Sequence, residues 1–271
     1  MSLRLERNRF RVLRQDPPWK VVRAFRQPGG ETLIHLNNIS GGVLAGDRLA
    51  LEVVVEAGAA AQITTTGATR LYRHRPGAGD SEQTSTFWVG KGARLEYLPD
   101  LLIPYAQSRH AQRTAIHLAP GATLFWWETL APGRLAAGEA FAFERLRIET
   151  EIRAGDRPLL LENFLLEPSE RPPAVTARMR EYSYLASLYV CQEGRPAAFW
   201  RDLEDRLTEA ARTRTRPGEA MWGASALASD GVVVRGLSAS SRFIQAALTD
   251  FWRLARRAVT GEEPTLPRKI Y

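Results

Sequence analysis

The chain has 271 residues, of which 44% are hydrophobic, enough apolar material for a large packed core. Cys191 is the only cysteine, so internal disulfides and clusters of several cysteine ligands are excluded. No run approaches the roughly 20 apolar residues of a membrane-spanning helix, and the N-terminal segment lacks the apolar run of a secretory signal. We therefore expect a cytoplasmic globular protein with no membrane part, in which Cys191 is a buried thiol.

The formal charge of +7 comes almost wholly from arginine, since Lys20, Lys91 and Lys269 are the only lysines. Basic proteins bind nucleic acids or acidic partners. Here the arginines are spread along the chain and alternate with acidic residues, without the basic run that marks a nucleic-acid-binding tail. The charge therefore favours an acidic protein partner, and an arginine-rich nucleic-acid-binding protein is the alternative.

In the N-terminal part, residues 10–13 and 20–25 are short alternating stretches separated by turn residues, and we expect two strands there. A strand then leads into a loop with glycines at 41, 42 and 46, and residues 49–55 alternate as a further strand. The glycine spacing imitates a phosphate-binding loop, but Asp47 and Arg48 stand where that motif needs Lys and Ser/Thr. The loop is therefore predicted to be a tight corner whose glycines serve backbone geometry.

Four segments share one plan, in which a strand ends at a short turn closed by glycine and a second strand follows. The glycines are Gly58, Gly92, Gly121 and Gly155, at spacings of 34, 29 and 34 residues. Such a period is typical of stacked repeats, since one unit cannot bury its own apolar face and neighbouring units can. We predict a mainly β fold, a β-helix-like stack of strand pairs. Four unrelated hairpins in a sandwich or barrel are the alternative.

The character of the chain changes after Pro168, and two amphipathic α-helices are predicted in the C-terminal third. Residues 179–191 suit a strand, and residues 196–212 show apolar side chains at helical spacing. After a short strand around residues 232–234, a second helix carries an apolar stripe that can cover the β body or meet a partner. We expect one domain over residues 1–271, with a β body at about 1–190 and a helix-containing part at about 191–271.

Few residues suggest catalysis, since the four histidines show no metal-ligand spacing and no Gly-x-Ser-x-Gly elbow is present. Counting seven residues beyond each turn glycine reaches Thr65, Pro99, Glu128 and Glu162. The stacking therefore predicts Glu128 and Glu162 at equivalent positions of adjacent layers. Two carboxylates in a partly apolar surround share a proton, recruit an arginine such as Arg134, or bind a cation. Transient holding of a divalent ion and a hydrolase that uses this acid/base pair both remain open.

Several segments together resemble the family of the urease accessory protein UreD, also called UreH. They follow one another in the family's order over nearly the whole chain. The segments are residues 40–49 (SGGVLAGDRL), 64–73 (TTTGATRLYR), 95–100 (LEYLPD), 133–134 (GR) with 138–141 (GEAF), and 267–268 (PR).

The resemblance implies a non-enzymatic scaffold in nickel insertion. Such proteins have a β-helical body with two helices, bind the accessory protein UreF, and assemble through it with the GTPase UreG on apo-urease. The family's scheme passes nickel through an internal channel. On this basis we expect a transient Ni²⁺ path, no permanently bound cofactor, and GTP hydrolysis in the partner UreG.

The resemblance also suggests roles for particular residues. The transient nickel path is assigned to Glu128, Glu162, Asp100 and Glu96. The channel wall or its structural support is assigned to Arg134, Tyr72, Asp47 and Thr65. Partner binding is assigned to the second helix and the tail, through Phe251, Trp252, Arg256, Arg268 and Tyr271.

Overall fold

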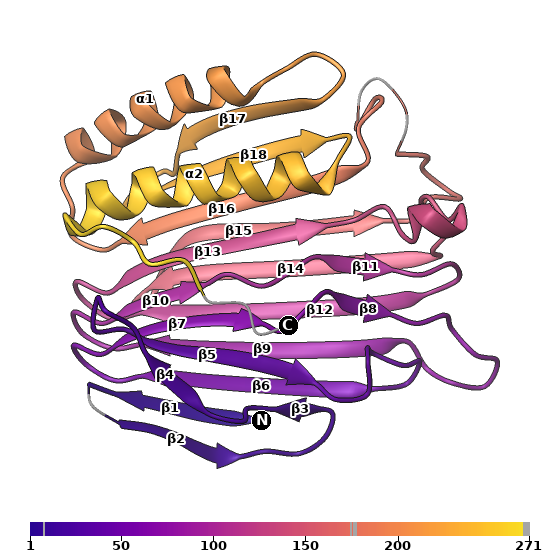
Figure 1. Ribbon diagram of the computed structural model, residues 1–271, viewed down its shortest axis with the longest axis horizontal. Coiled ribbons are helices and arrows are strands. Elements are labelled where there is room, and N and C mark those ends of the chain that lie inside the picture. Colours follow the sequence, from indigo (N-terminus) through magenta and orange to yellow (C-terminus); the bar gives the residue numbers. More distant parts are fainter. Residues whose placement is uncertain (8, 174, 176–177, 268–271) are drawn as a thin grey trace.

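The computed structural model describes residues 1–7, 9–173, 175 and 178–267 (Figure 1). In this part of the chain the strands form two sheets that lie face to face, and helices α1 (Ala197–Arg214) and α2 (Ser241–Thr260) cover the outer face of the second. The first sheet runs in the order β15 (Arg157–Leu166), β14 (Arg145–Ala154), β12 (Arg109–Leu118), β9 (Ser81–Val89), β6 (Arg48–Val55), β1 (Ser2–Glu6) and β2 (Arg9–Arg14).

The second sheet follows the path β17 (Ala220–Ala226), β18 (Gly231–Ser238), β16 (Tyr184–Gln192), β13 (Thr123–Leu130), β10 (Arg94–Tyr97), β7 (Ala60–Thr65), β5 (Thr32–Asn38) and β3 (Trp19–Lys20). The short strands β4 (Ala24–Arg26), β8 (Thr69–Leu71) and β11 (Leu102–Pro104) lie beside this path. A 3₁₀ turn, η1 (Leu135–Ala137), interrupts the connection between β13 and β14.

From β5 to β14 the chain passes back and forth between the two sheets. Successive strands within each sheet pair in parallel: β6, β9, β12 and β14 in the first, and β5, β7, β10 and β13 in the second. Ala60, Arg94 and Thr123 share one level of the stack. Each lies two residues beyond a turn glycine with positive φ. The predicted β-helix-like stack of strand pairs is confirmed for these units.

The fourth unit differs from the predicted repeat. β14 and β15 form an antiparallel hairpin in which Ala154 pairs with Arg157. A two-residue connection joins only antiparallel neighbours, whereas the longer corners earlier in the chain let it cross to the opposite sheet. β15 therefore stays in the first sheet, and β16 takes the place beside β13. As a result, Glu162 lies on the sheet opposite to Glu128, and the prediction that they occupy adjacent layers of one stack is wrong.

In the second sheet, the central strands β7, β10 and β13 are buried on both faces. Its inner face packs against the first sheet through side chains such as Ile63 and Leu124, and its outer face packs under the helices through Phe125 and Trp127. A strand covered on both sides needs apolar residues at odd and even positions. This double burial explains why residues 124–127 of β13 are apolar at four successive positions.

Helices α1 and α2 confirm the two predicted helices. α2 follows Ser240, whose hydroxyl accepts a hydrogen bond from the Arg242 amide, and ends at Gly261 with a φ of 71°. Its stripe covers the chain's own second sheet through residues such as Leu248. The sequence did not reveal strand β17, which pairs with β18 at the edge of this sheet. Neither α1 nor α2 has the length and hydropathy that a membrane crossing requires.

A buried ion pair holds α2 against the second sheet. Glu96 of β10 accepts hydrogen bonds from Arg256 Nε at 2.8 Å, Trp252 Nε1 at 3.1 Å and Gln62 Nε2 at 3.2 Å. Arg94 Nε lies 3.3 Å from the same carboxylate. The Glu96 and Arg256 side chains are each only 1% exposed. Their charges are therefore compensated by protein groups rather than by water.

Replacing Arg256 by methionine should lower the free energy of unfolding by about 3 kcal/mol, because the Glu96 charge then stays buried with only Arg94 as a cationic neighbour. Urea unfolding followed by tryptophan fluorescence measures this loss. Arg257→Met is the matched control, because its ion pair with Glu263 is exposed and water compensates both charges when such a pair is lost. Equal losses in the two variants would contradict the role assigned to the buried pair.

Candidate functional site

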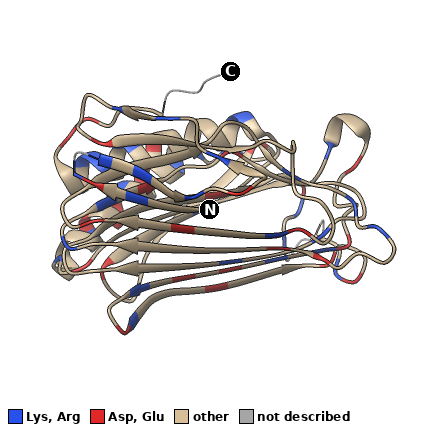
Figure 2. Ribbon diagram, turned by 90° about the horizontal axis from the view of Figure 1, so that it is seen from below, with Lys and Arg blue, Asp and Glu red and all other residues tan. Residues whose placement is uncertain are grey.

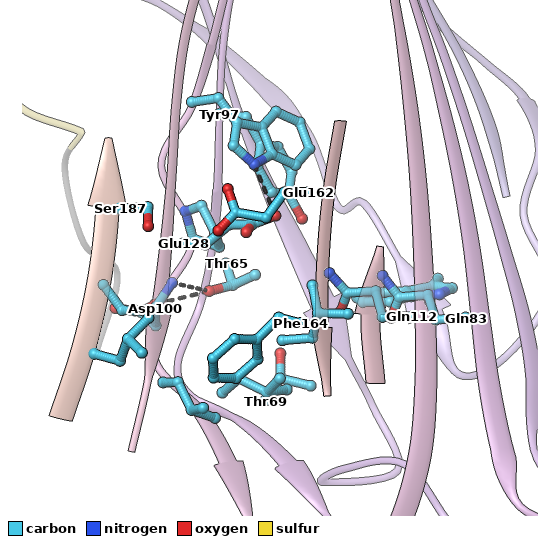
Figure 3. Close-up of a pocket in the computed structure, with 18 residues that line it drawn as sticks. Thr65, Thr69, Gln83, Tyr97, Asp100, Gln112, Glu128, Glu162, Phe164 and Ser187 are labelled. Carbon is cyan, nitrogen blue, oxygen red and sulfur yellow. Dashed lines mark hydrogen bonds between the residues drawn. The ribbon is translucent and has the colours of Figure 1, made fainter. Parts of the chain in front are cut away.

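A cavity lies between the inner faces of the two sheets (Figure 3). The volume of this cavity is about 80 Å³. One water molecule needs roughly 10–15 Å³. Pockets for drug-sized ligands have volumes of roughly 300–1,000 Å³. The space suits a few waters or a small ion. Its polar lining comprises Thr65, Thr69, Gln83, Asp100, Gln112, Glu128, Thr129, Glu162 and Ser187.

Glu128 reaches this cavity from β13. Its Oε1 accepts hydrogen bonds from the Trp126 indole at 3.1 Å and from the Thr150 hydroxyl at 3.0 Å. Burial raises the pKa of the Glu128 carboxyl, these two hydrogen bonds oppose the rise, and the charge of Glu162 adds to it. A cation in the cavity would offset both the burial and the like-charge repulsion.

Glu162 reaches the same cavity from β15, and Figure 3 shows its carboxylate turned toward Glu128. Its Oε2 accepts hydrogen bonds from the Tyr189 hydroxyl and, at 2.8 Å, from Arg235. The two carboxylates thus meet from facing sheets, and the arginine beside them is Arg235. The suggestion that Arg134 compensates them is wrong, because Arg134 forms its ion pair with Glu139 in the loop before β14.

Thr65 and Asp100 form a second polar contact in the cavity wall. The Thr65 hydroxyl donates to Asp100 Oδ2 at 2.9 Å and accepts from the Asp100 amide at 2.8 Å. Thr65, Pro99 and Glu128, each seven residues beyond its turn glycine, all line the cavity. The parallel register of β7, β10 and β13 places them together. The spacing of the turn glycines therefore predicts correctly that these three residues form one wall of the site.

Two further hollows share lining residues with the cavity. A recess of about 210 Å³ shares Trp19, Thr65 and Thr69 with it and is bordered by the glycine loop at residues 41–42. A groove of about 610 Å³ shares Glu162 and Ser187 with it and lies along β16, β17 and β18. Glu162 therefore borders both the cavity and the groove.

The glycine loop at the rim of the recess is shaped by backbone geometry. Gly41 and Gly46 have φ values of 80° and 81°, and a Cβ on Gly42 would lie 2.6 Å from a backbone carbonyl oxygen. The Asp47 carboxylate accepts a hydrogen bond from the Leu44 amide at 2.8 Å. Asp47 therefore stabilises the loop. Among the residues that the structure describes, Asp47 is not part of the cavity wall.

Tyr72 and Arg134 lie together outside the cavity. Tyr72 packs edge-on against Tyr105, with ring centroids 5.2 Å apart, and the Arg134 guanidinium lies 4.4 Å from the centroid of the same ring. The Tyr72 hydroxyl also lies 3.4 Å from the Gly41 carbonyl oxygen. These two side chains support the loops near the glycine corner.

Glu96 faces α2 rather than the cavity. Side chains alternate along a strand, so Tyr97 of β10 lines the cavity while Glu96 points to the opposite face and binds Arg256. The geometry therefore does not support the expectation that Glu96 belongs to an interior nickel path.

The partner-binding assignments fall into two groups. Phe251 and Trp252 are 0% exposed and Arg256 is 1% exposed, so in this conformation their side chains hold α2 on the sheet and present no surface. Arg268 and Tyr271 lie outside the described residues.

Three residues that contact the two carboxylates were not predicted from the sequence: Thr150, Tyr189 and Arg235. Arg235 carried the clearest signal, because it interrupts an otherwise apolar strand after three valines. Thr150 pairs with Glu162 across the β14–β15 hairpin, whereas β16 and β18 reach the two carboxylates only through long-range strand pairing. Among the residues that the structure describes, no three His, Cys, Asp or Glu side chains gather as a metal cluster.

A buried serine and histidine form a pair near one end of β9 and β12. The Ser81 hydroxyl lies 2.9 Å from His110 Nδ1 and 3.0 Å from the Arg109 carbonyl oxygen. A serine nucleophile with a histidine base must be reached by its substrate. Both residues are 2% exposed. Cys191 is also fully buried, and burial raises the pKa of its thiol to about 12, as expected of an inert core cysteine.

The sequence of this chain is similar to those of known proteins. The family model described as "UreD urease accessory protein" matches residues 1–270. The Urease accessory protein UreD of Herpetosiphon aurantiacus is 43% identical over 274 residues, covering 100% of this chain and 94% of that protein. The protein of the same name from Deinococcus radiodurans is 33% identical over 94% of this chain and 87% of its own length. One from an Anaeromyxobacter species is 37% identical over 83% and 73%.

The stability of the protein should fall between pH 6.5 and pH 4 because of His110. Burial lowers the pKa of His110 from its usual 6.5 to about 4, so in this range the unfolded chain binds a proton that the folded chain does not. Stability is therefore highest above pH 6.5 and lost as the pH falls, by about 3 kcal/mol for this group. Urea unfolding of His110→Gln and the natural chain at pH 7 and pH 4 measures the difference. Parallel losses in both would contradict it.

Proposed function

Because the chain belongs to the UreD family of urease accessory proteins, we propose that it is a non-enzymatic scaffold that passes nickel to apo-urease through its interior. The family assignment gives the urease accessory role. The nickel cargo, its route and the partners are the proposal, and the cavity with Glu128 and Glu162 is the observation that carries it.

The cavity's chemistry supports a transient path for a divalent ion. Glu128 and Glu162 supply two carboxylates in a space of about 80 Å³, and Thr65 and Asp100 add further oxygen atoms to its wall. Oxygen ligands without cysteine hold nickel less tightly than sites with imidazole or thiolate ligands. Weak holding suits a path, since an ion that binds strongly does not leave.

The proposed partners are UreF, the GTPase UreG and apo-urease, in the cytoplasm. The glycine loop carries Asp47 and Arg48 in place of the residues that hold nucleotide phosphates, so GTP hydrolysis is assigned to UreG. No nickel is held permanently in this scheme, because the carboxylate pair serves only passage.

The two alternative functions fit the structure less well. A glycosidase-type hydrolase needs room for a sugar between its carboxylates, and the cavity is far too small. For nucleic-acid binding, free arginines are needed, yet on the outer face of the first sheet Arg113 pairs with Glu149 and Arg145 with Asp80. Figure 2 shows basic and acidic residues interspersed along the strands.

Reconstitution tests the proposal directly. Apo-urease is mixed with UreF, UreG, GTP, bicarbonate and nickel, with or without this chain, and urease activity is followed. We expect strong activation only when the chain is present. Equal activation without it would overturn the proposed function.

The double variant Glu128→Gln, Glu162→Gln should reduce this activation at least several-fold, because the amides fill the same space without attracting a cation. Each single variant should show a smaller loss. Glu149→Gln is the matched control, since Glu149 lies outside the cavity lining and pairs with Arg113. Full activation by the double variant would rule out a path along these carboxylates.

A further inference from the structure

The junction between cavity and groove is occupied by a cationic side chain of the protein itself. Arg235 stands on β18 and lines the groove, while Glu162 lines both groove and cavity. The Arg235 guanidinium donates to Glu162 Oε2 at 2.8 Å, and the Tyr189 hydroxyl donates to the same oxygen. The carboxylate oxygen that an ion would use at this junction is therefore already occupied.

The same contact is easily displaced. The Arg235 side chain is 51% exposed and that of Glu162 is 26% exposed, so this pair is far more open to solvent than the Glu96–Arg256 pair under α2. Ion pairs with such exposure contribute little to stability, because water compensates both charges when they separate. The guanidinium can turn into the open groove while the Tyr189 hydroxyl still donates to Glu162.

We propose that Arg235 is a displaceable gate at the groove end of the passage, a built-in cation that occupies Glu162 until a divalent ion replaces it. This inference rests on the proposed function and adds how binding and release of the ion are controlled. A doubly charged ion attracts the Glu128–Glu162 pair more strongly than one guanidinium does. Arrival of the ion releases Arg235 into the groove, and departure of the ion lets Arg235 return. The gate thereby prevents the carboxylates from retaining the ion.

Nickel binding to the purified full-length chain tests the gate without any urease activity. Arg235→Gln removes the competing charge but keeps a polar side chain, and equilibrium dialysis with nickel sulfate should show affinity on the order of tenfold higher than that of the natural chain. Arg235→Met, which keeps the aliphatic stem, should show the same gain and serves if the glutamine variant folds poorly. Arg157→Gln, which removes a half-exposed guanidinium that pairs with Asp230 and lines neither cavity nor groove, is the matched control and should leave nickel affinity unchanged.

The dependence on Glu162 separates a gate from a general charge effect. Adding Glu162→Gln to Arg235→Gln should abolish the gain, because the guanidinium and the ion compete for that carboxylate. An unchanged affinity in both Arg235 variants, or a gain that survives Glu162→Gln, would overturn the gate.

Failure of the gate and failure of the proposed function give different results. If the Glu128→Gln, Glu162→Gln variant loses nickel binding and urease activation while the Arg235 variants match the natural chain, the passage stands and the gate fails. If that double glutamate variant binds nickel and activates urease like the natural chain, the proposed function itself fails.

Discussion

Burial of the central strands of the second sheet on both faces is the constraint on which the rest of the structure depends. Parallel strands wound between two sheets expose one face of each sheet to solvent unless another layer covers it. Here α1 and α2 cover the second sheet, and the core between them includes Trp127, Trp200 and Phe251. The Glu96–Arg256 pair fixes α2 in that place. The wall that carries Glu128 is therefore packed against α1 and α2 on its far side.

Support behind this wall is needed because the cavity in front of it is lined by polar side chains. Keeping Glu128 inside the protein has an energetic cost that two hydrogen bonds only partly offset. A purely structural core would be filled more cheaply by apolar side chains. The interior also keeps Gln83 and Gln112 opposite the second sheet's polar residues. This polar interior is the feature that the proposed ion path uses.

Two glutamate–arginine pairs, one under α2 and one between the facing sheets, show how exposure changes the role of one interaction. Glu96 and Arg256 are almost wholly buried, so separating them leaves a charge without compensation. Glu162 and Arg235 are open to the groove, so separating them leaves both charges to water. The first pair is suited to holding a helix, and the second to a contact that forms and breaks.

The sequence by itself determined the stacked strand pairs, the corner at the glycine loop, both helices and the family. These follow from local signals: turn glycines at a regular spacing, strand alternation and helical periodicity. The same spacing brought Thr65, Pro99 and Glu128 to one wall, because parallel neighbours in a stack keep their register. Such features depend on residues close together in the chain, or on a repeat that makes distant residues equivalent.

Only the tertiary structure decided how the site is completed. The two-residue turn at Gly155 keeps β15 in the first sheet, so Glu162 meets Glu128 from the facing sheet. Tyr189 and Arg235 reach Glu162 because β16 and β18 extend the second sheet by antiparallel pairing. Strand pairing of this kind is set by which edges remain free after the stack has formed. No local pattern in the sequence encodes that choice.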